Sequence, residues 1–305
     1  MQVAAIQMTA VLGDVEANLA SARRLATEAF ARGAELVILP EFFTSAMGFH
    51  PLMKSAARPL EGAPLALLRE LAAAHDGVIG GSFITAEPDG NYNTFVLMFP
   101  DGRFFTHQKD QPTMWENCYY RGGTDDGVLD TPLGPVGAAL CWEFVRSRTA
   151  RRLAGRVDLV VGGSCWWSLP KKRLPGFTRQ VAAKNREIMR LTPARFARLA
   201  GCPVIHAAHA GAFACRTPLL PGFPYESEYL GETQIVDADG TVRARITREQ
   251  GEGIALAAVT PGRVTPVETA PPGFWIPDLP LPIRLAWWYQ NRHGRWYYRR
   301  HMRRP

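Results

Sequence analysis

Apolar residues follow two alternating spacings along the first part of this chain. Residues 2–7 alternate as in a short strand, and residues 15–29 then carry aliphatic side chains at helical spacing. A compact aliphatic strand follows at 35–39, and a helical pattern at 64–75 leads into a third strand at 78–85. Strands and helices that alternate in this way predict an α/β fold.

Hairpins are expected in the middle of the chain. The turn Pro100-Asp101-Gly102 joins two strands within 92–107, and Leu133-Gly134-Pro135 separates strands at 128–131 and 136–141. A further strand at 157–161 precedes a more polar segment with a helical pattern over 178–199. Later strands are expected at 203–207, 233–236, 242–246 and 254–259. The compact body should end near residue 262, which divides the chain into a domain of residues 1–262 and an extension of residues 263–305.

Composition narrows the class of protein. The 305 residues are 47% hydrophobic, enough for one large α/β core or two modest ones. The N-terminal segment has no basic region of a signal peptide, and no apolar run approaches a membrane-spanning length. Five cysteines without a CxxC pair argue against a disulfide framework and against a structural metal site, so we expect no metal and a reducing cytoplasm.

The net charge of +7 belongs to the end of the chain. Residues 279–305 contain seven Arg and no acidic side chain, and the other 278 residues carry 28 basic and 28 acidic side chains. Residues 283–305 also hold three Trp and three Tyr. Such an arm suits peripheral contact with acidic lipids, RNA binding by stacking and phosphate contact, or docking on another subunit of a homo-oligomer.

Three chemically complementary side chains stand at the ends of predicted strands. Glu41 follows the apolar run 36–40, Cys141 ends the run 136–140, and Lys109 ends another strand. Open α/β sheets place their sites at such strand ends. A nucleophilic cysteine needs a base or a positive charge nearby, which Glu41 can supply, and Lys109 can stabilise negative charge that develops on a substrate. Taken singly, each residue is better explained by core packing, a helix cap, a salt bridge or a surface charge than by catalysis.

The order of motifs around these residues favours a catalytic role over a structural one. The blocks are Leu36-Val-Ile-Leu-Pro-Glu41-Phe-Phe, His107-Gln-Lys109-Asp-Gln-Pro-Thr-Met-Trp-Glu116, and Asp130-Thr-Pro-Leu-Gly-Pro-Val-Gly-Ala-Ala-Leu-Cys141-Trp142-Glu143. Over roughly residues 2–262 the chain resembles the nitrilase, or carbon-nitrogen hydrolase, superfamily. Shorter matches are Gly80-Gly-Ser-Phe, Tyr92-Asn-Thr, Gly201-Cys-Pro-Val-Ile and Gly231-Glu-Thr-Gln-Ile-Val-Asp.

The resemblance implies a four-layer αββα sandwich with two mixed sheets and a catalytic triad of Glu41, Lys109 and Cys141. It also implies a thioimidate or thioester intermediate on the cysteine that water hydrolyses, without metal or organic cofactor. Lys109 and the backbone N–H of Trp142 would stabilise the tetrahedral intermediate. Glu116 matches a second glutamate of the family, expected to orient Lys109 or the substrate; its alternative is a surface charge.

The motifs look closer to nitrilases than to amidases, because Cys141 is followed by Trp-Glu and Glu116 ends the lysine block. The residues after Glu41 and after Glu143 depart from the nitrilase pattern. Three functions therefore stay open: a nitrilase, an amidase or N-carbamoyl hydrolase with the same triad, and a catalytically inactive scaffold that binds through its basic arm. We expect Trp142, Glu143, Trp166 and Trp167 to contact the substrate. The two later tryptophans favour an aromatic or apolar acyl group, and packing between subunits is the alternative for them.

Overall fold

Helices and strands succeed one another much as the hydrophobic pattern predicts. The computed structural model describes residues 1–172, 178–218 and 223–302. Its α-helices are α1 (Val15–Ala31), α2 (Ala63–His75), α3 (Ser147–Leu153), α4 (Arg179–Ala200) and α5 (Leu281–His301). Short 3₁₀ helices are η1 (Pro51–Ser55), η2 (Met114–Cys118), η3 (Cys141–Val145) and η4 (Arg248–Gln250).

The strands carry the architecture. They are β1 (Gln2–Met8), β2 (Leu36–Ile38), β3 (Val78–Glu87), β4 (Gly90–Met98), β5 (Phe104–Gln108), β6 (Val128–Thr131), β7 (Gly134–Leu140), β8 (Leu159–Ser164), β9 (Val204–Arg216), β10 (Pro224–Leu230), β11 (Thr233–Val236), β12 (Val242–Ile246) and β13 (Gly253–Ala258). Most predicted strands are present within a few residues of the expected bounds.

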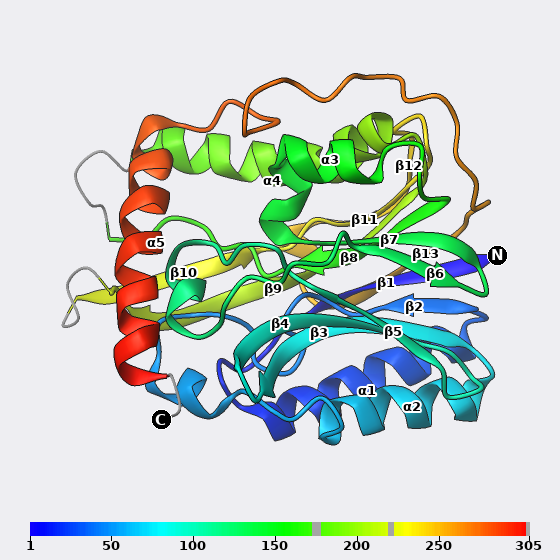
Figure 1. Ribbon diagram of the computed structural model, residues 1–305, viewed down its shortest axis with the longest axis horizontal. Coiled ribbons are helices and arrows are strands. Elements are labelled where there is room, and N and C mark those ends of the chain that lie inside the picture. The colour runs from blue at the N-terminus through cyan, green and yellow to red at the C-terminus, as the bar shows by residue number, and fades with distance from the viewer. Residues whose placement is uncertain (173–177, 219–222, 303–305) are drawn as a thin grey trace.

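The strands follow one hydrogen-bonded path that folds into two facing halves. The path runs β5-β4-β3-β2-β1-β9-β8-β7-β6, with β13 paired to β1 and with β11 and β12 extending from β9. The halves join where Gln7 and Met8 of β1 pair with β9. Helices α1 and α2 cover one outer face, and α3 and α4 cover the other (Figure 1). Parallel pairs such as β1–β2 and antiparallel pairs such as β3–β4 occur together, which confirms the αββα sandwich of mixed sheets.

Apolar side chains fill the three spaces between these four layers. Successive strand residues point to opposite faces, so Ile6 of β1 packs toward α1 and α2 while Val3 packs toward the other half of the sheet. Strand β8 divides in the same way: Val161 joins the cluster between the halves, and Val160 joins the cluster beneath α3 and α4. Near-continuous apolar strands are therefore a consequence of burial on both faces.

A β-hairpin extends the second half of the sheet further than the sequence pattern indicated. Strand β9 continues to Arg216 and pairs antiparallel with β10, for which no strand was predicted. The sequence held a signal for β10, because two glutamates alternate with Tyr225, Ser227 and Tyr229. In the structure these three residues are buried and the glutamates between them are not. The alternation is that of a strand with one buried face.

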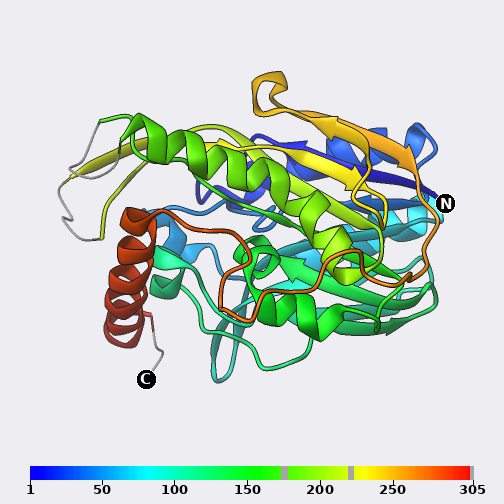
Figure 2. The ribbon, with the colours of Figure 1, turned by 90° about the horizontal axis from the view of Figure 1, so that it is seen from above.

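The basic arm up to His301 forms helix α5, which stands across one end of the sandwich, opposite the N-terminus (Figures 1 and 2); Arg303 and Arg304 lie outside the described residues. Its buried residues recur at helical spacing: Ile283, Gln290, Asn291, Gly294 and Tyr298. Asn291 Oδ1 accepts hydrogen bonds from the Met114 N–H (2.7 Å) and from Asn117 Nδ2 (3.0 Å), and Tyr298 Oη accepts one from the Asn91 N–H (2.8 Å). The arm therefore docks on its own chain.

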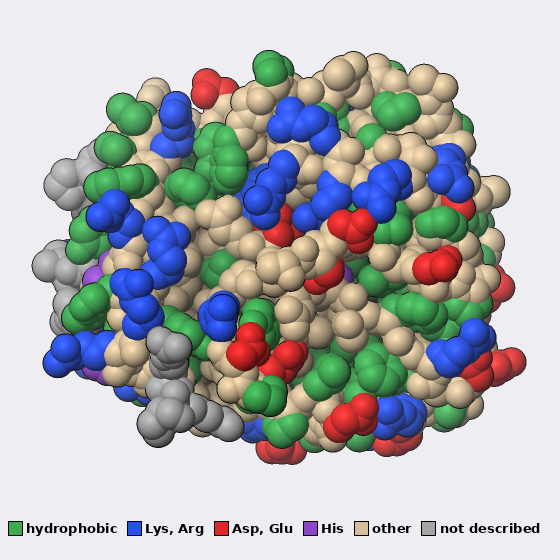
Figure 3. Space-filling view, in the orientation of Figure 1, with side chains coloured by type: hydrophobic (Ala, Val, Ile, Leu, Met, Phe, Trp, Pro, Cys, Tyr) green, Lys and Arg blue, Asp and Glu red, His purple; other side chains and the backbone are tan. Residues whose placement is uncertain are grey.

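The outer face of α5 carries the charge. Its described arginines are exposed, namely Arg284, Arg292, Arg295, Arg299 and Arg300. Figure 3 shows basic side chains over α5 and along the α3 side of this face, with hydrophobic side chains among them. Within residues 1–172, 178–218 and 223–302, no helix combines the length and the apolar character that a bilayer crossing requires.

Candidate active site

Glu41 is fully buried and lies just beyond β2. Its Oε1 accepts hydrogen bonds from Lys109 Nζ (2.7 Å) and from Asn93 Nδ2 (2.9 Å), and its Oε2 accepts one from the Cys165 N–H (2.9 Å). Three donors, two just after β5 and β8 and one within β4, thus fix both oxygens of one carboxylate. Asn93 stood in a family-like block of the sequence, but only the fold shows that it reaches Glu41.

Lys109 follows β5 and bridges two carboxylates. Its Nζ lies 2.7 Å from Glu41 Oε1 and 2.7 Å from Glu116 Oε2, and all three side chains are fully buried. Glu116 Oε2 also accepts hydrogen bonds from the Thr113 N–H (2.8 Å) and from Tyr120 Oη. Glu116 Oε1 has no hydrogen-bond partner among the described residues. The surface-charge alternative for Glu116 does not fit this burial.

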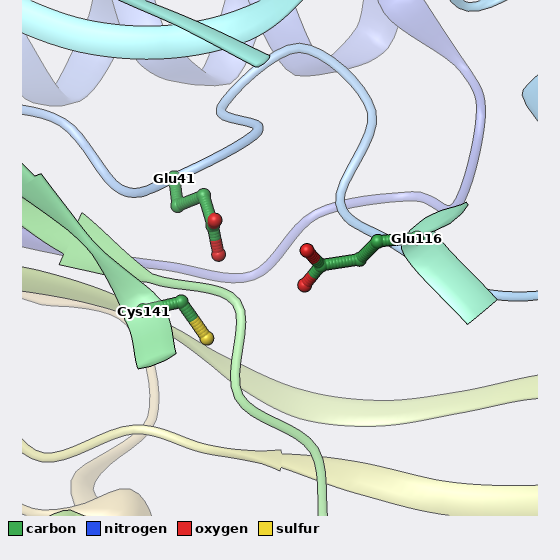
Figure 4. Close-up of side chains that lie close together, drawn as sticks. All are labelled: Glu41, Glu116 and Cys141. Carbon is green, nitrogen blue, oxygen red and sulfur yellow. The ribbon is translucent and has the colours of Figure 1, made fainter. Parts of the chain in front are cut away.

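Cys141 begins η3 directly after β7, with φ at 50°. A left-handed backbone at a residue with a side chain costs about 1–3 kcal/mol and marks a tight turn held by its surroundings. The turn aims Sγ toward the two carboxylates, as Figure 4 shows. Sγ of Cys141 and carboxylate oxygens of Glu41 and Glu116 all lie within 4.8 Å of one another. A thiol and two carboxylates this close together are groups that could hold a cation. The positive charge that lies beside them, among the described residues, is the Lys109 ammonium, which is bonded to both carboxylates.

The pKa of the Glu41 carboxyl group lies near neutral pH. Burial raises its pKa to about 7, although the Lys109 ammonium opposes this rise. Burial alone would lower the pKa of Lys109, but the carboxylates of Glu116 and Glu41 outweigh burial and raise it, so this side chain stays protonated. Burial and the neighbouring Glu41 raise the pKa of the Cys141 thiol well above its usual value. The sulfur therefore rests as a thiol and needs a base to become a nucleophile.

Glu143 lies behind the cysteine turn and faces away from the cavity. One oxygen accepts hydrogen bonds from His107 Nε2 (3.0 Å) and the Leu140 N–H (2.9 Å), and the other accepts one from the Asp110 N–H (3.0 Å). Burial alone would lower the pKa of His107, but the carboxylates of Glu143 and Asp125 raise it to about 10. Glu143 therefore ties the end of β5, which presents Lys109, to the turn that presents Cys141.

A cavity of about 130 Å³ opens beside Cys141. Its walls are mostly aromatic and aliphatic. The lining residues are Met114, Trp115, Cys141, Trp142, Trp166, Trp167, Leu169, Pro170, Asn185, Thr217, Phe223, Tyr225, Ile283, Ala286 and Gln290. Asn185 of α4 accepts a hydrogen bond from Trp166 Nε1 (3.1 Å) and donates one to the Trp167 carbonyl (3.2 Å), which fixes the Trp166 ring and the backbone at Trp167.

The structure brings together most of the residues that the sequence singled out. Glu41, Lys109, Glu116 and Cys141 converge, and Trp142, Trp166 and Trp167 line the cavity beside them; Glu143 is not among the lining residues. Sequence reasoning missed the contributions of Asn185, Tyr225 and the three residues of α5. Tyr225 could have been found from the alternation in β10, whereas nothing local in the sequence connects α5 to the cavity.

Comparison with known proteins agrees with this arrangement. The family model of carbon-nitrogen hydrolases matches residues 2–269. Nitrilase 3 of Arabidopsis thaliana is 31% identical over 166 residues, which cover 47% of each protein. N-carbamoylputrescine amidase of Solanum lycopersicum is 30% identical over 163 residues, which cover 50% of this chain and 54% of the relative.

Solved structures share the fold. A carbon-nitrogen hydrolase from Helicobacter pylori G27 superimposes with a TM-score of 0.71 at 18% identity, over 84% of this chain and 88% of its own. In sequence, the chain spans about half the length of the relatives that it matches. The family match ends at residue 269 and therefore excludes α5.

Proposed function

This chain belongs to the carbon-nitrogen hydrolase family, and on that premise we propose that it hydrolyses a small nitrile to a carboxylic acid and ammonia through a covalent bond to Cys141. The observation that carries the proposal is that the Glu41 carboxyl group and the Lys109 ammonium lie beside the Cys141 thiol, which itself lines the cavity. Together they offer a nucleophile, a base with a pKa of about 7 and a fixed positive charge.

In the first half of the reaction, Glu41 takes the thiol proton and Sγ attacks the nitrile carbon. A carbon–sulfur bond forms while one carbon–nitrogen π bond breaks, and Glu41 passes the proton it took to the nitrogen, which gives a thioimidate and leaves Glu41 ionised. The Lys109 ammonium, held by two carboxylates, stabilises the negative charge that develops on nitrogen. We assign the same task to the backbone N–H of Trp142.

In the second half, Glu41 takes a proton from water, and the water oxygen adds to the thioimidate carbon. Glu41 returns this proton to the nitrogen, and the added hydroxyl gives up its own proton to the nitrogen as the carbon–nitrogen bond breaks, so ammonia leaves and a thioester remains. A second water adds in the same way, the carbon–sulfur bond breaks, and the carboxylic acid leaves as the thiol of Cys141 is restored. A base whose pKa lies close to neutrality suits both the uptake and the return of protons.

An amide is the second candidate substrate, because the same groups serve amide hydrolysis and because amidases stand among the relatives. For an amide, attack gives the thioester directly and one water completes the cycle. The cavity argues against a substrate with a cationic amine, such as an N-carbamoyl diamine. Its lining residues in the described part of the chain include no Asp or Glu that would pair with an ammonium.

The test is a panel of nitriles, primary amides and N-carbamoyl compounds offered to purified protein and to Cys141→Ala. We expect ammonia release from nitriles, little from N-carbamoyl compounds, and a loss of at least about 10³-fold in Cys141→Ala. Release from amides alone would contradict the nitrile preference. Turnover that survives in Cys141→Ala would contradict the covalent route, and an inactive native protein would favour the scaffold function.

We further propose a cytoplasmic homo-oligomer in which the outer face of α5 makes contact. Trp288 and Trp296 are 57% and 49% exposed there, and large exposed aromatics commonly mark interfaces. Sedimentation at micromolar concentration should show more than one subunit. A monomer that instead binds anionic vesicles or RNA would assign this face to one of the other two hypotheses.

A further inference from the structure

One wall of the cavity beside Cys141 belongs to helix α5, which lies outside the family match. Ile283, Ala286 and Gln290 follow one another at intervals of three and four residues on α5, so they share one face, and all three line the cavity. Ile283 is 2% exposed and packs in the same apolar cluster as Cys141. The family match ends at residue 269, so this wall is a feature of the extension rather than of the shared sandwich.

The segment that leads into α5 is fastened to η3, the turn that presents the nucleophile. The Ile276 N–H donates a hydrogen bond to the carbonyl of Val145, the last residue of η3 (2.9 Å). The ring of Trp275 meets that of Trp142 edge-on at 5.3 Å between centroids, and meets Trp287 of α5 in the same way at 5.2 Å. Edge-to-face contacts between large rings hold α5 in a defined position relative to the cysteine turn.

The same helix is also fixed to η2, which carries Glu116. Asn291 Oδ1 accepts hydrogen bonds from the Met114 N–H and from Asn117 Nδ2. Helix α5 is therefore attached to both short helices that carry residues of the site. Close-packed elements held at two points yield little, so a substrate that is too large cannot push this wall aside without breaking those contacts.

The size and the walls of the cavity suit one aromatic ring. A volume of about 130 Å³ is close to that of a roughly 150 Å³ apolar cavity that accepts benzene. Trp115 and Trp167 stack at 4.4 Å between ring centroids, and both line the cavity. Ala286 is the smallest of the three side chains that α5 contributes, and it stands between Ile283 and Gln290 in that row. Any larger side chain at this position would take up part of the space.

We infer that α5 sets the size of the acyl group, with Ala286 leaving room for a single aromatic ring and Ile283 limiting that room. The preferred substrates are then nitriles, or the corresponding amides, whose acyl group carries one flat apolar ring. Specificity of this kind comes from excluding larger groups by packing. The inference rests on the proposed function, because it names the substrate class of the same site.

The experiment measures kcat/KM for propionitrile, benzonitrile and 2-naphthonitrile, together with the matching amides. In native protein, benzonitrile should exceed 2-naphthonitrile by at least about tenfold, because a second ring does not fit the cavity. Ala286→Phe places a ring of the size of benzene in the cavity and should lower the benzonitrile-to-propionitrile ratio by about tenfold or more. Ile283→Ala removes most of a side chain from the wall and should raise the 2-naphthonitrile-to-benzonitrile ratio by about tenfold.

Leu285 provides the matched controls, because it neighbours Ala286 on α5 but is 59% exposed. Leu285→Phe and Leu285→Ala make the same two kinds of change on the outer side of the helix and should leave both ratios at their native values. Each readout is a ratio between two substrates of one variant, so a general loss of activity or stability does not move it. If Ala286→Phe does not fold, Ile283→Ala and its control decide on their own.

The outcomes separate this inference from the proposed function. Native ratios in Ala286→Phe and Ile283→Ala, equal shifts in the Leu285 controls, or native turnover of 2-naphthonitrile as fast as that of benzonitrile would each overturn the inference and leave the function intact. If native protein turns over no substrate, the function fails, and calorimetric binding of benzene and indole to the same variants decides the inference. Ala286→Phe should then weaken benzene binding by about tenfold, and Ile283→Ala should strengthen binding of the two-ring indole relative to benzene. Unchanged affinities, or no binding of benzene to native protein, would overturn it.

Discussion

At the scale of residues, the site depends on burying four ionisable groups without leaving their charges unbalanced. Glu41, Lys109, Glu116 and Cys141 are all essentially inaccessible to solvent. Isolated buried charges are costly, and one ammonium between two carboxylates reduces that cost. Burial, which disfavours the ionised carboxylate, and the lesser repulsion from Glu116 together outweigh Lys109 and raise the pKa of Glu41 to about 7.

The pH dependence of turnover tests this description of Glu41. Because the ionised carboxylate is the base, and because its folded-state pKa is about 7, the rate should rise with pH and reach half its plateau near pH 7. Below that value Glu41 is protonated and cannot accept the thiol proton. Single-turnover rates between pH 5 and pH 9 measure the midpoint.

Glu41→Gln should lose about 10²–10⁴-fold in rate and should no longer show this midpoint. Glu61→Gln, which changes an exposed carboxylate, serves as the control. A midpoint near the ordinary glutamate value, or a rate that does not change from pH 5 to pH 9, would contradict the assignment of Glu41 as base.

At the scale of elements, the close contact between α5 and η2 connects the extension to the catalytic groups. A Cβ added at Gly294 would lie 2.5 Å from Asn117 Cβ and 3.0 Å from the Asn117 carbonyl carbon. Only glycine permits this approach, which also sets the two hydrogen bonds of Asn291 to η2. Since η2 carries Glu116, the position of α5 bears on the carboxylate that holds Lys109.

Gly294→Val should therefore displace α5, lower kcat/KM by about tenfold or more, and destabilise the fold by about 1–3 kcal/mol. Helix propensity alone predicts the opposite change in stability, because valine forms helix better than glycine. Arg295→Val places the same side chain on the exposed neighbouring position and is the control. Thermal unfolding and kcat/KM are measured for both variants. If Gly294→Val and Arg295→Val change stability and activity equally, close packing at Gly294 does not explain the effect.

At the scale of the whole molecule, much of the site was predictable because it follows from local sequence and sheet geometry. Glu41, Lys109 and Cys141 each come just after a strand, and strands of one sandwich bring such ends together. The place of Glu143 was not predictable in this way, because the short helix η3 turns its side chain away from the cavity and toward His107.

The role of the extension could not be predicted, because it depends on contacts between residues far apart in the chain. Asn291 and Asn117 are 174 positions apart and meet only after the sandwich has formed. From the sequence, arginine and aromatic residues indicated a surface for lipid, RNA or another subunit. The fold shows that the same helix has a second, buried face on which Ile283 and Gln290 reach the cavity. A division of the chain at residue 262, as predicted from the sequence, would separate two stretches whose residues line one pocket.

The most direct test of the central claim is to look for the covalent bond itself. Native protein and Glu41→Gln are mixed with an aromatic nitrile, quenched in acid within the first turnover, digested, and analysed by mass spectrometry. We expect an acyl or imidoyl adduct on Cys141 alone among the five cysteines of the native protein, and almost none in Glu41→Gln. Ammonia release without any adduct at Cys141, or equal adducts in both proteins, would contradict the account.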